Sequence, residues 1–262
     1  IEKRALDGNE LWWLKEGPGA HFGEPCDAET VDASLSGRFQ FVEESAERVG
    51  LRRPQLGALH AILAHRSTEE NEPLTVVMPT GTGKTETMLA TYCHTPQRTL
   101  VVVPSDALRS QIATKFATLG VLPTLGAITG DFRCPVVLVL KSRLQSVAHA
   151  ADVITPANVI VATAQVLNAC SDEARAYLAK SCRRLLVDEA HHLGARTWRD
   201  VVGLFDGREI VQFTATPYRE DGRHLGGRIA YAYPLRLAQA NGYFARINYH
   251  SVVDVANPDR AL

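Results

Sequence analysis

The sequence lacks a strong excess of charge of either sign. Its 28 lysine and arginine residues nearly balance 29 aspartate and glutamate residues, so the formal net charge is −1. A protein that coats nucleic acid by charge alone needs a broad basic field, which this composition does not provide. The balance still allows a protein that holds a few phosphates with backbone N–H groups, because such contacts need no net positive charge.

Long apolar runs and paired cysteines are also absent. No apolar stretch approaches the roughly 20 residues that a helix needs to span a bilayer, and the first residues do not resemble a signal peptide. No Cys-x-x-Cys pair and no zinc-like spacing with histidine occurs among Cys26, Cys93, Cys134, Cys170 and Cys182. We therefore expect buried thiols in a reducing compartment, a cytoplasmic location and no membrane partner. Because the chain begins at Ile1, we also expect that its natural N-terminus has been lost.

Short apolar runs that alternate with helical patterns are the main feature from Pro54 onward. The expected strands are rich in valine, isoleucine and leucine and cover residues 74–78, 99–103, 136–140, 159–163, 185–188 and 210–214. Continuous apolar strands of this kind are typical of a parallel sheet that is buried on both faces. The sequence therefore predicts an α/β fold with a mostly parallel sheet and helices on both of its faces.

The ends and two internal segments fit this alternation less well. Residues 1–50 are expected to form an irregular N-terminal arm or extension, because Gly17, Pro18, Gly19 and Pro25 interrupt any periodicity, with an anchor formed by Trp12, Trp13 and Leu14. The main domain is then expected to cover residues 51–255.

Within that domain, residues 142–156 are expected to form an inserted excursion and residues 219–227 a mobile loop rich in glycine and charge. The tail from Pro234 is expected to form one short helix and then a strand over residues 247–255.

A glycine-rich loop, Met-Pro-Thr-Gly-Thr-Gly-Lys-Thr at residues 78–85, lies between an expected strand and an expected helix. In this setting backbone N–H groups and the helix N-terminus converge on phosphate oxygens. Lys84 is expected to pair with the β- and γ-phosphates and Thr85 to bind Mg²⁺. The strict pattern has glycine where Met78 stands, so the alternative is an ordinary turn before a lysine. The residues expected at the nucleotide are Thr80, Gly81, Thr82, Gly83, Lys84, Thr85 and Glu86.

Two adjacent acids end another apolar strand, in the segment Asp188-Glu189-Ala190-His191. We expect Asp188 to hold Mg²⁺ through water and Glu189 to orient or deprotonate the attacking water. The alternative is an aspartate that only caps a helix. His191 is assigned to the catalytic switch rather than to a metal, because no His-x-x-x-His spacing accompanies it.

Together, this acidic box and the loop at residues 78–85 resemble the N-terminal RecA-like domain of superfamily 2 DEAD/DEAH-box helicases and translocases, over roughly residues 50–255. The resemblance implies a RecA-like P-loop NTPase fold, with ATP and Mg²⁺ as cofactors. It also implies a nucleic-acid partner, with DNA favoured over RNA, and a second RecA-like lobe in the same longer chain.

Other segments follow the order of the family's motifs. Residues 51–55 resemble the segment that contacts adenine, which implies base contacts by Gln55 with Arg53 beside it, although the family more often has tyrosine where Pro54 stands. Residues 103–105, 162–165 and 213–217 resemble motifs Ia, Ib and III. The residues thereby implied in coupling and nucleic-acid contact are Ser105, Thr163, Gln165, Thr214 and Thr216.

DNA phosphates are expected to meet backbone N–H groups near Ser105, Gly130 and Thr163. Residues 218–222 are similar to the branch that contains type III restriction subunits and UvrB-like or XPB-like translocases, which suggests a restriction or phage-defence setting.

The second lobe's Gln-x-x-Gly-Arg-x-x-Arg signature is missing; the nearest match, around Arg223 and Arg228, directly follows the motif III segment. We therefore expect one lobe of a longer chain, which binds ATP but hydrolyses it poorly by itself because an arginine finger contributes roughly 10³–10⁵ in rate.

The leading hypothesis is the ATP-binding lobe of an ATP-dependent DNA helicase or translocase. A nucleotide-sensing interaction module of a larger nucleic-acid-processing assembly is the alternative, and a P-loop kinase or metabolic ATPase is a third. The intact set of Lys84, Thr85, Asp188 and Glu189 argues against the second reading, and Gln55 and the residues at 214–216 have no role in the third.

Overall fold

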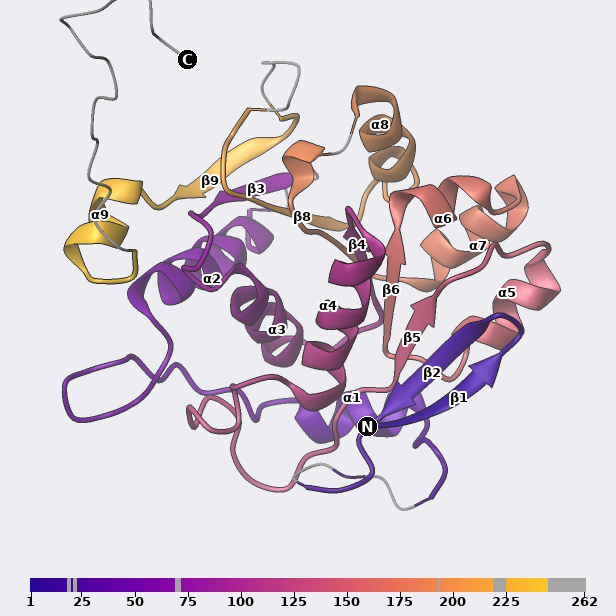
Figure 1. The fold of residues 1–262 in the computed structure, drawn as a ribbon, viewed down its shortest axis with the longest axis horizontal. Helices are drawn as coiled ribbons and strands as arrows, with labels where there is room; N and C mark the ends of the chain where they lie inside the picture. The colour runs from indigo at the N-terminus through magenta and orange to yellow at the C-terminus, as the bar shows by residue number, and fades with distance from the viewer. Residues whose placement is uncertain (18–19, 21–22, 69–71, 193, 219–224, 245–262) are drawn as a thin grey trace, which may run out of the picture.

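The computed structural model describes residues 1–17, 20, 23–68, 72–192, 194–218 and 225–244. Their strands form one sheet in the order β1-β2-β5-β6-β4-β7-β8-β3-β9 (Figure 1). The strands are β1 (Glu2–Leu6), β2 (Asn9–Trp13), β3 (Leu74–Val77), β4 (Thr99–Val103), β5 (Val137–Leu140), β6 (Val159–Thr163), β7 (Arg184–Val187), β8 (Glu209–Thr214) and β9 (Arg228–Ala232). From β5 to β9 in this order every neighbouring pair is parallel. The predicted α/β fold with a mostly parallel sheet is confirmed.

The two faces of the sheet carry separate helical layers. One core contains apolar residues of α1 (Ala28–Leu35), α2 (Arg53–Arg66), α3 (Lys84–His94) and α4 (Asp106–Thr118). The other contains those of α5 (Val147–Ile154), α6 (Ala164–Ala169), α7 (Asp172–Ser181) and α8 (Ala195–Gly203). Successive residues of β4 point to opposite sides, since Val101 and Val103 belong to the first core and Leu100 and Val102 to the second. Because both sides of a central strand such as β4 face a core, neither side carries a polar surface.

The expectation of an irregular arm is wrong for much of residues 1–50. β1 and β2 form an antiparallel hairpin, and β2 pairs antiparallel with β5, so the hairpin extends the main sheet. Trp12 packs in one core and Trp13 in the other, which confirms the expected anchor. The hairpin escaped prediction because β1 is almost fully exposed and carries charged side chains, so its apolar periodicity is weak.

Other segments also differ from expectation. The supposed excursion at residues 142–156 contains α5, whose apolar side packs in the second core. β9 was not predicted; it pairs parallel with β3 and precedes α9 (Leu235–Ala240), which matches the expected short helix. The strand expected at residues 247–255 and most of the loop at 219–227 lie outside the described residues.

Four cysteines are buried, as expected, and burial raises the pKa of both Cys134 and Cys182 to about 12. No helix in the described part of the chain combines the length and apolarity needed to cross a bilayer.

Candidate functional site

The glycine-rich loop leaves the carboxyl end of β3 and enters α3 at Lys84. Two of its residues, Gly81 and Gly83, have positive φ angles of 83° and 97°, which favour glycine. A Cβ atom on Gly83 would lie only 2.0 Å from Nε2 of Gln55, so a larger residue there must displace that side chain. The glycine at position 83 is therefore required both for its backbone angle and for the close approach of α2.

Lys84 brings the loop and the acidic box together. Its Nζ atom lies 2.9 Å from Oε1 of Glu189 and donates to the carbonyl oxygen of Met78 at 3.4 Å. The side chain of Lys84 is only 8% exposed, so this ion pair is shielded from water. Two motifs that are far apart in the sequence thus form one cluster, as predicted.

Asp188 is the more deeply buried of the two acids. Burial and the neighbouring charge of Glu189 raise the pKa of Asp188 to about 6, against the opposing influence of Lys84. Two acids beside one lysine leave this corner with an excess of negative charge. Carboxylate and hydroxyl oxygens are ligands that Mg²⁺ accepts, so Asp188 and Thr85, which both line the cavity described below, fit a site for this ion.

A chain of polar contacts leads from the acidic box to the end of β8. His191 Nδ1 lies 3.4 Å from Glu189 Oε2 and 2.9 Å from Thr214 Oγ1. The Thr214 hydroxyl in turn donates to the carbonyl oxygen of Thr216 at 2.6 Å. The structure therefore joins four residues from two predicted motifs, the acidic box and the segment at residues 213–217, in one connected row that starts at the candidate catalytic acid.

Glu189 itself has a φ of 47°, in the left-handed region that non-glycine residues seldom adopt. Its backbone N–H donates to Asp188 Oδ1 at 3.1 Å, which helps to hold this conformation. Strained backbone of this kind is concentrated at functional sites.

The first turn of α2 lies against the loop, where Gln55 lines the cavity described below as expected, but Arg53 does not. Gln55 is 5% exposed and its Oε1 accepts the backbone N–H of Arg52 at 2.7 Å. The Arg53 side chain points to Glu43, with Nε and Oε1 3.4 Å apart, and does not line the cavity. Arg52 lines it instead, and its Nη1 donates to the carbonyl oxygen of Gly81 at 3.0 Å. The structure thus places Arg52 at the cavity in place of the expected Arg53.

The local backbone explains why Arg52 rather than Arg53 reaches the cavity. Arg52 is the extended residue before the helix, whereas Arg53 is its first helical residue, so the two side chains leave in different directions. The sequence shows two adjacent arginines and contains no signal for which of them faces the loop.

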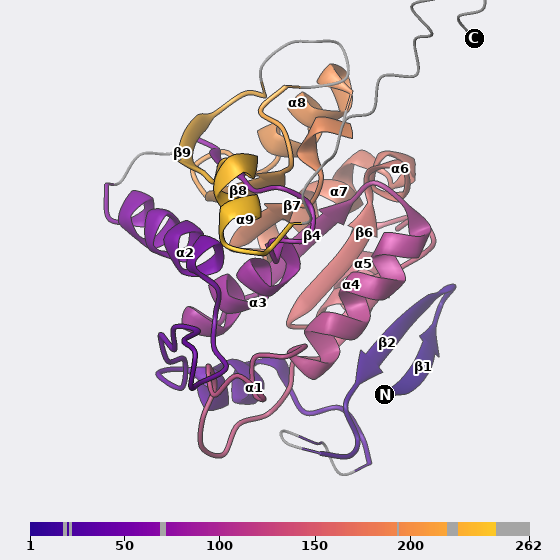
Figure 2. The ribbon, with the colours of Figure 1, turned by 60° about the vertical axis from the view of Figure 1, so that its left-hand side comes forward.

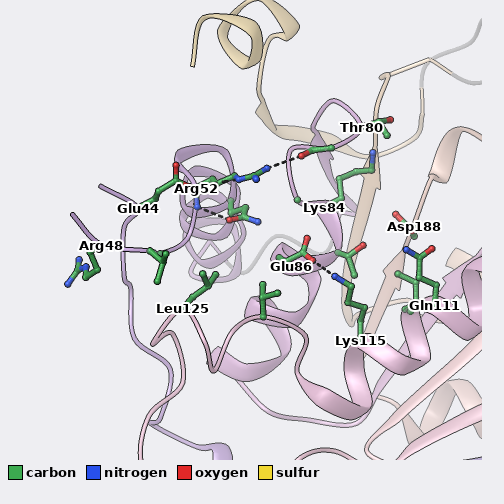
Figure 3. A pocket seen from close by; sticks show the side chains of 18 of the residues that line it. Glu44, Arg48, Arg52, Thr80, Lys84, Glu86, Gln111, Lys115, Leu125 and Asp188 are labelled. Carbon is green, nitrogen blue, oxygen red and sulfur yellow. Dashed lines mark hydrogen bonds and ion pairs between the residues drawn. The ribbon is translucent and has the colours of Figure 1, made fainter. Parts of the chain in front are cut away.

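A cavity of about 930 Å³ connects these groups. Figure 3 shows Glu44, Arg48 and Arg52 at one end and Lys84 and Asp188 at the other, with the Glu86–Lys115 ion pair, 2.7 Å long, between them. Most of the predicted loop residues line it, namely Thr80, Gly81, Gly83, Lys84, Thr85 and Glu86. Thr82 does not, because its side chain is buried and donates to the carbonyl oxygen of Pro79 at 2.6 Å.

The walls also include residues that sequence reasoning missed: Glu44, Arg48, Val49, Arg52, Leu108, Gln111, Ile112, Lys115, Val121 and Leu125. They come from the segment before α2, from α4 and from the turn after α4, and apart from Arg52 none of them belongs to a motif recognised in the sequence.

The family model described as "Type III restriction enzyme, res subunit" matches residues 48–219, which is more than half of the chain. The chain belongs to this family. With its nine-stranded, mostly parallel sheet, this member of the res-subunit family is the ATP-binding, N-terminal RecA-like lobe of a superfamily 2 helicase.

Solved structures show partial likeness to this res-subunit lobe. A nuclease-deletion mutant of the type ISP restriction-modification enzyme LlaGI, in complex with a DNA substrate mimic, is 18% identical, with a TM-score of 0.48 over 74% of this chain and 20% of that chain. The UvsW helicase from bacteriophage T4 is 13% identical, with a TM-score of 0.44 over 68% of this chain and 57% of that chain.

A hypothetical ATP-dependent RNA helicase from Sulfolobus tokodaii is 18% identical, with a TM-score of 0.45 over 64% of this chain and 47% of that chain. The chain thus spans less than two thirds of each of these proteins. No curated protein sequence matches it.

A second cavity of the res-subunit lobe, of about 710 Å³, lies beside the carboxyl ends of β4 and β6, and the predicted residues Thr163, Thr214 and Thr216 are not among those that line it. Ser105 and Gln165 line it together with His192. Ser105 also caps α4, and Thr163 caps α6 by accepting the N–H of Val166 at 3.3 Å, so both hydroxyls hold helix N-termini at this edge.

Gly130 does not belong to this group. It does not line the second cavity, and a Cβ atom on it would lie 2.5 Å from Nη1 of Arg38. The two residues before it in the chain pair with the segment after α1, through the Phe39–Ile128 bridge and the bond from Thr129 to Arg38. The structure therefore does not bring Gly130 to the second cavity that Ser105 lines.

Proposed function

We propose that this lobe binds ATP with Mg²⁺ in the 930 Å³ cavity and hydrolyses it to drive movement along DNA. The observation that carries the proposal is the meeting of Lys84 and Glu189, 2.9 Å apart, at the carboxyl edge of the sheet inside a cavity lined by the glycine-rich loop. If the loop were purely structural, nothing would require its lysine to contact an acid from a distant segment.

The ion pair suggests how the site responds to ATP. Phosphate oxygens compete with Glu189 for the Lys84 ammonium, because the lysine has a single compact charge. When the phosphates take Lys84, the Glu189 carboxylate is released and can orient or deprotonate the attacking water. Thr85 and Asp188 would hold Mg²⁺, which neutralises charge on the β- and γ-phosphates during transfer.

Nucleic acid would contact the second cavity. Ser105 and Thr163 cap helices there, and helix N-termini with backbone N–H groups bind phosphate without a broad basic surface. The row from Glu189 through His191 and Thr214 to Thr216 would report the state of the nucleotide to the end of β8. Such contacts carry no base sequence information, in keeping with a translocase. The family description supports a restriction or phage-defence setting.

A nucleotide-sensing interaction module is the competing function, because it would keep the same binding residues and not need hydrolysis. Glu189→Gln separates the two. The change removes a carboxylate that can accept a proton but preserves the shape of the side chain, so we expect ATP to bind and DNA-stimulated hydrolysis by the full-length protein to fall by about 10²-fold or more.

Lys84→Ala is the matched control for binding, measured with a fluorescent ATP analogue, and is expected to lose affinity. DNA-stimulated hydrolysis that survives Glu189→Gln would refute the catalytic assignment and favour the sensing module.

A further inference from the structure

Arg52 makes a contact with the phosphate loop that no motif predicts. Its Nη1 donates to the Gly81 carbonyl oxygen, and the next N–H in the chain, that of Thr82, donates to the carbonyl oxygen of Pro79 at 3.2 Å. Both ends of the peptide unit between Gly81 and Thr82 are thus held. Because that unit lies in the middle of the loop, its orientation affects the directions of the neighbouring N–H groups that would face phosphate.

Arg52 is itself held from the far end of the chain. Its guanidinium carbon lies 5.3 Å from the ring centroid of Tyr243, which follows α9. Arg52 also forms an ion pair with Glu44, in which Nε and Oε2 are 3.8 Å apart; the Glu44 side chain is well exposed, so this pair constrains the arginine weakly. An aromatic face limits where a planar guanidinium can lie more strongly than an exposed, distant ion pair does.

Tyr243 is fixed in this position by the packing of β9 and α9 on α2. Its N–H donates to the carbonyl oxygen of Ala238 at 2.8 Å, and the neighbouring Asn241 donates to the Tyr233 hydroxyl at 2.7 Å. Tyr231 packs against Gly57 so closely that a Cβ atom there would lie 2.6 Å from its hydroxyl oxygen. Burial, together with the charge of Glu44, raises the pKa of Tyr243.

We propose that Arg52 is a positioning residue of the phosphate loop and that Tyr243, through Arg52, ties nucleotide affinity to the placement of residues 241–244, the turn after α9. Tyr243 does not line the nucleotide cavity, so its effect must pass through Arg52. The inference rests on the proposed binding of ATP in that cavity. It assigns to the C-terminal end of this lobe a direct mechanical connection to the loop (Figures 1 and 2 show α9 beside the start of α2).

A double-mutant cycle tests it on the 262-residue chain, with affinity for a fluorescent ATP analogue and Mg²⁺ as the first readout. We expect Arg52→Ala to weaken binding about tenfold, from the lost charged hydrogen bond, and Tyr243→Leu to weaken it about threefold. The double variant should bind no more weakly than Arg52→Ala alone. Tyr243→Phe, which keeps the ring, should restore most of the affinity, and the thermal midpoint of Tyr243→Leu should stay close to that of the wild type.

Arg236→Ala is the matched control, because it removes an exposed arginine from α9 itself. Effects of Arg52→Ala and Tyr243→Leu that multiply in the double variant, or an affinity that Tyr243→Leu leaves unchanged, would overturn the inference.

Hydrogen exchange of the amides at residues 80–82, measured without nucleotide, supplies the second readout. Both single variants should increase exchange there and Arg236→Ala should not; equal exchange in all of them would also overturn the inference. If the wild type and Lys84→Ala bind the analogue equally weakly, the proposed function fails. The exchange data would still decide whether Arg52 and Tyr243 hold the loop.

Discussion

At the scale of single residues, the site depends on positions where the backbone or the charge is unusual. Gly81 and Gly83 share positive φ angles but differ in their surroundings. Nothing lies within 4 Å of a Cβ atom built on Gly81, whereas one built on Gly83 meets Gln55. A substitution at Gly81 therefore tests backbone strain alone, whereas one at Gly83 tests strain together with crowding.

Gly81→Ala and Gly83→Ala should accordingly destabilise the protein to different degrees. The first introduces only strain, of about 1–2 kcal/mol. The second adds a clash with Gln55, so we expect a larger loss of unfolding free energy in urea and weaker nucleotide binding. Gln55→Ala in the Gly83→Ala background should recover part of the loss. Equal effects of the two glycine substitutions would show that Gln55 does not crowd the loop.

Asp188 should make stability depend on pH. Its pKa rises from an ordinary 3.8 to about 6 in the folded protein, mainly through burial. The folded state therefore holds the proton more tightly, so this residue contributes stability that is present below about pH 4 and is lost as pH rises through about 6. The difference corresponds to something on the order of 3 kcal/mol.

Asp188→Asn tests this expectation because it removes the charge and keeps the shape. With Mg²⁺ chelated, the stability of the variant relative to the wild type, from urea unfolding, should increase between pH 4 and pH 7. Comparing the two proteins cancels the contributions of other acids, such as Glu209, whose pKa is lowered by Arg184 and Arg66 despite its burial. A stability difference that is independent of pH would mean that Asp188 titrates normally.

At the scale of elements, buried polar groups tie α8, β8 and the start of β9 together. Gln212 is fully buried in β8; its Oε1 accepts the indole N–H of Trp198, and its Nε2 donates to the Gly226 carbonyl oxygen at 2.8 Å. Trp198 lies on α8, which follows the acidic box; Gln212 lies on β8, which ends at Thr214; and Gly226 lies just before β9. Packing alone would allow these elements to slide, whereas satisfied buried hydrogen bonds specify one arrangement.

Gln212→Leu should therefore cost about 2–4 kcal/mol of unfolding free energy, because it leaves buried partners on Trp198 and Gly226 without hydrogen bonds. Trp198→Phe removes one donor and should cost less. Gln111→Leu, at an exposed position on α4, serves as the control and should change stability by no more than about 0.5 kcal/mol. If Gln212→Leu behaves like the control, the buried bonds do not hold these elements in place.

At the scale of the whole molecule, the positions of the arginines bear on how fast the proposed hydrolysis can be. Among the described residues, the arginines that line the nucleotide cavity are Arg48 and Arg52, and both lie at the end away from Asp188 (Figure 3). Phosphoryl transfer in related enzymes gains roughly 10³–10⁵ in rate from an arginine at the transferred phosphate.

The 262-residue chain by itself should therefore bind ATP but turn it over at well below about 1 s⁻¹, even with saturating DNA. The turnover rate is measured as steady-state phosphate release, and the rate of the Lys84→Ala variant gives the background to be subtracted. A DNA-stimulated rate above that value from the chain alone would mean that its own residues complete the catalytic site.

Local sequence was sufficient for the parallel strands from β3 to β8 and for locating the glycine-rich loop and the acidic box. The apolar runs at 99–103 and 159–163 became β4 and β6 without change, because strands buried on both faces need continuous apolar residues. That the glycine-rich loop and the acidic box lie close together also followed from sequence, since parallel strands deliver the residues that follow them to the same edge of a sheet, but the ion pair between Lys84 and Glu189 did not.

Only the tertiary structure decided which distant segments pair as strands and which of two adjacent arginines reaches the cavity. The charged strand β1 joins the sheet only because β2 pairs with β5, and β9 forms only beside β3. The choice of Arg52 over Arg53, and its contact with Tyr243, depend on how the first turn of α2 meets elements from the far end of the chain. Side-chain direction at a helix start and pairing between distant segments are settled by packing, so the sequence around each residue does not encode them.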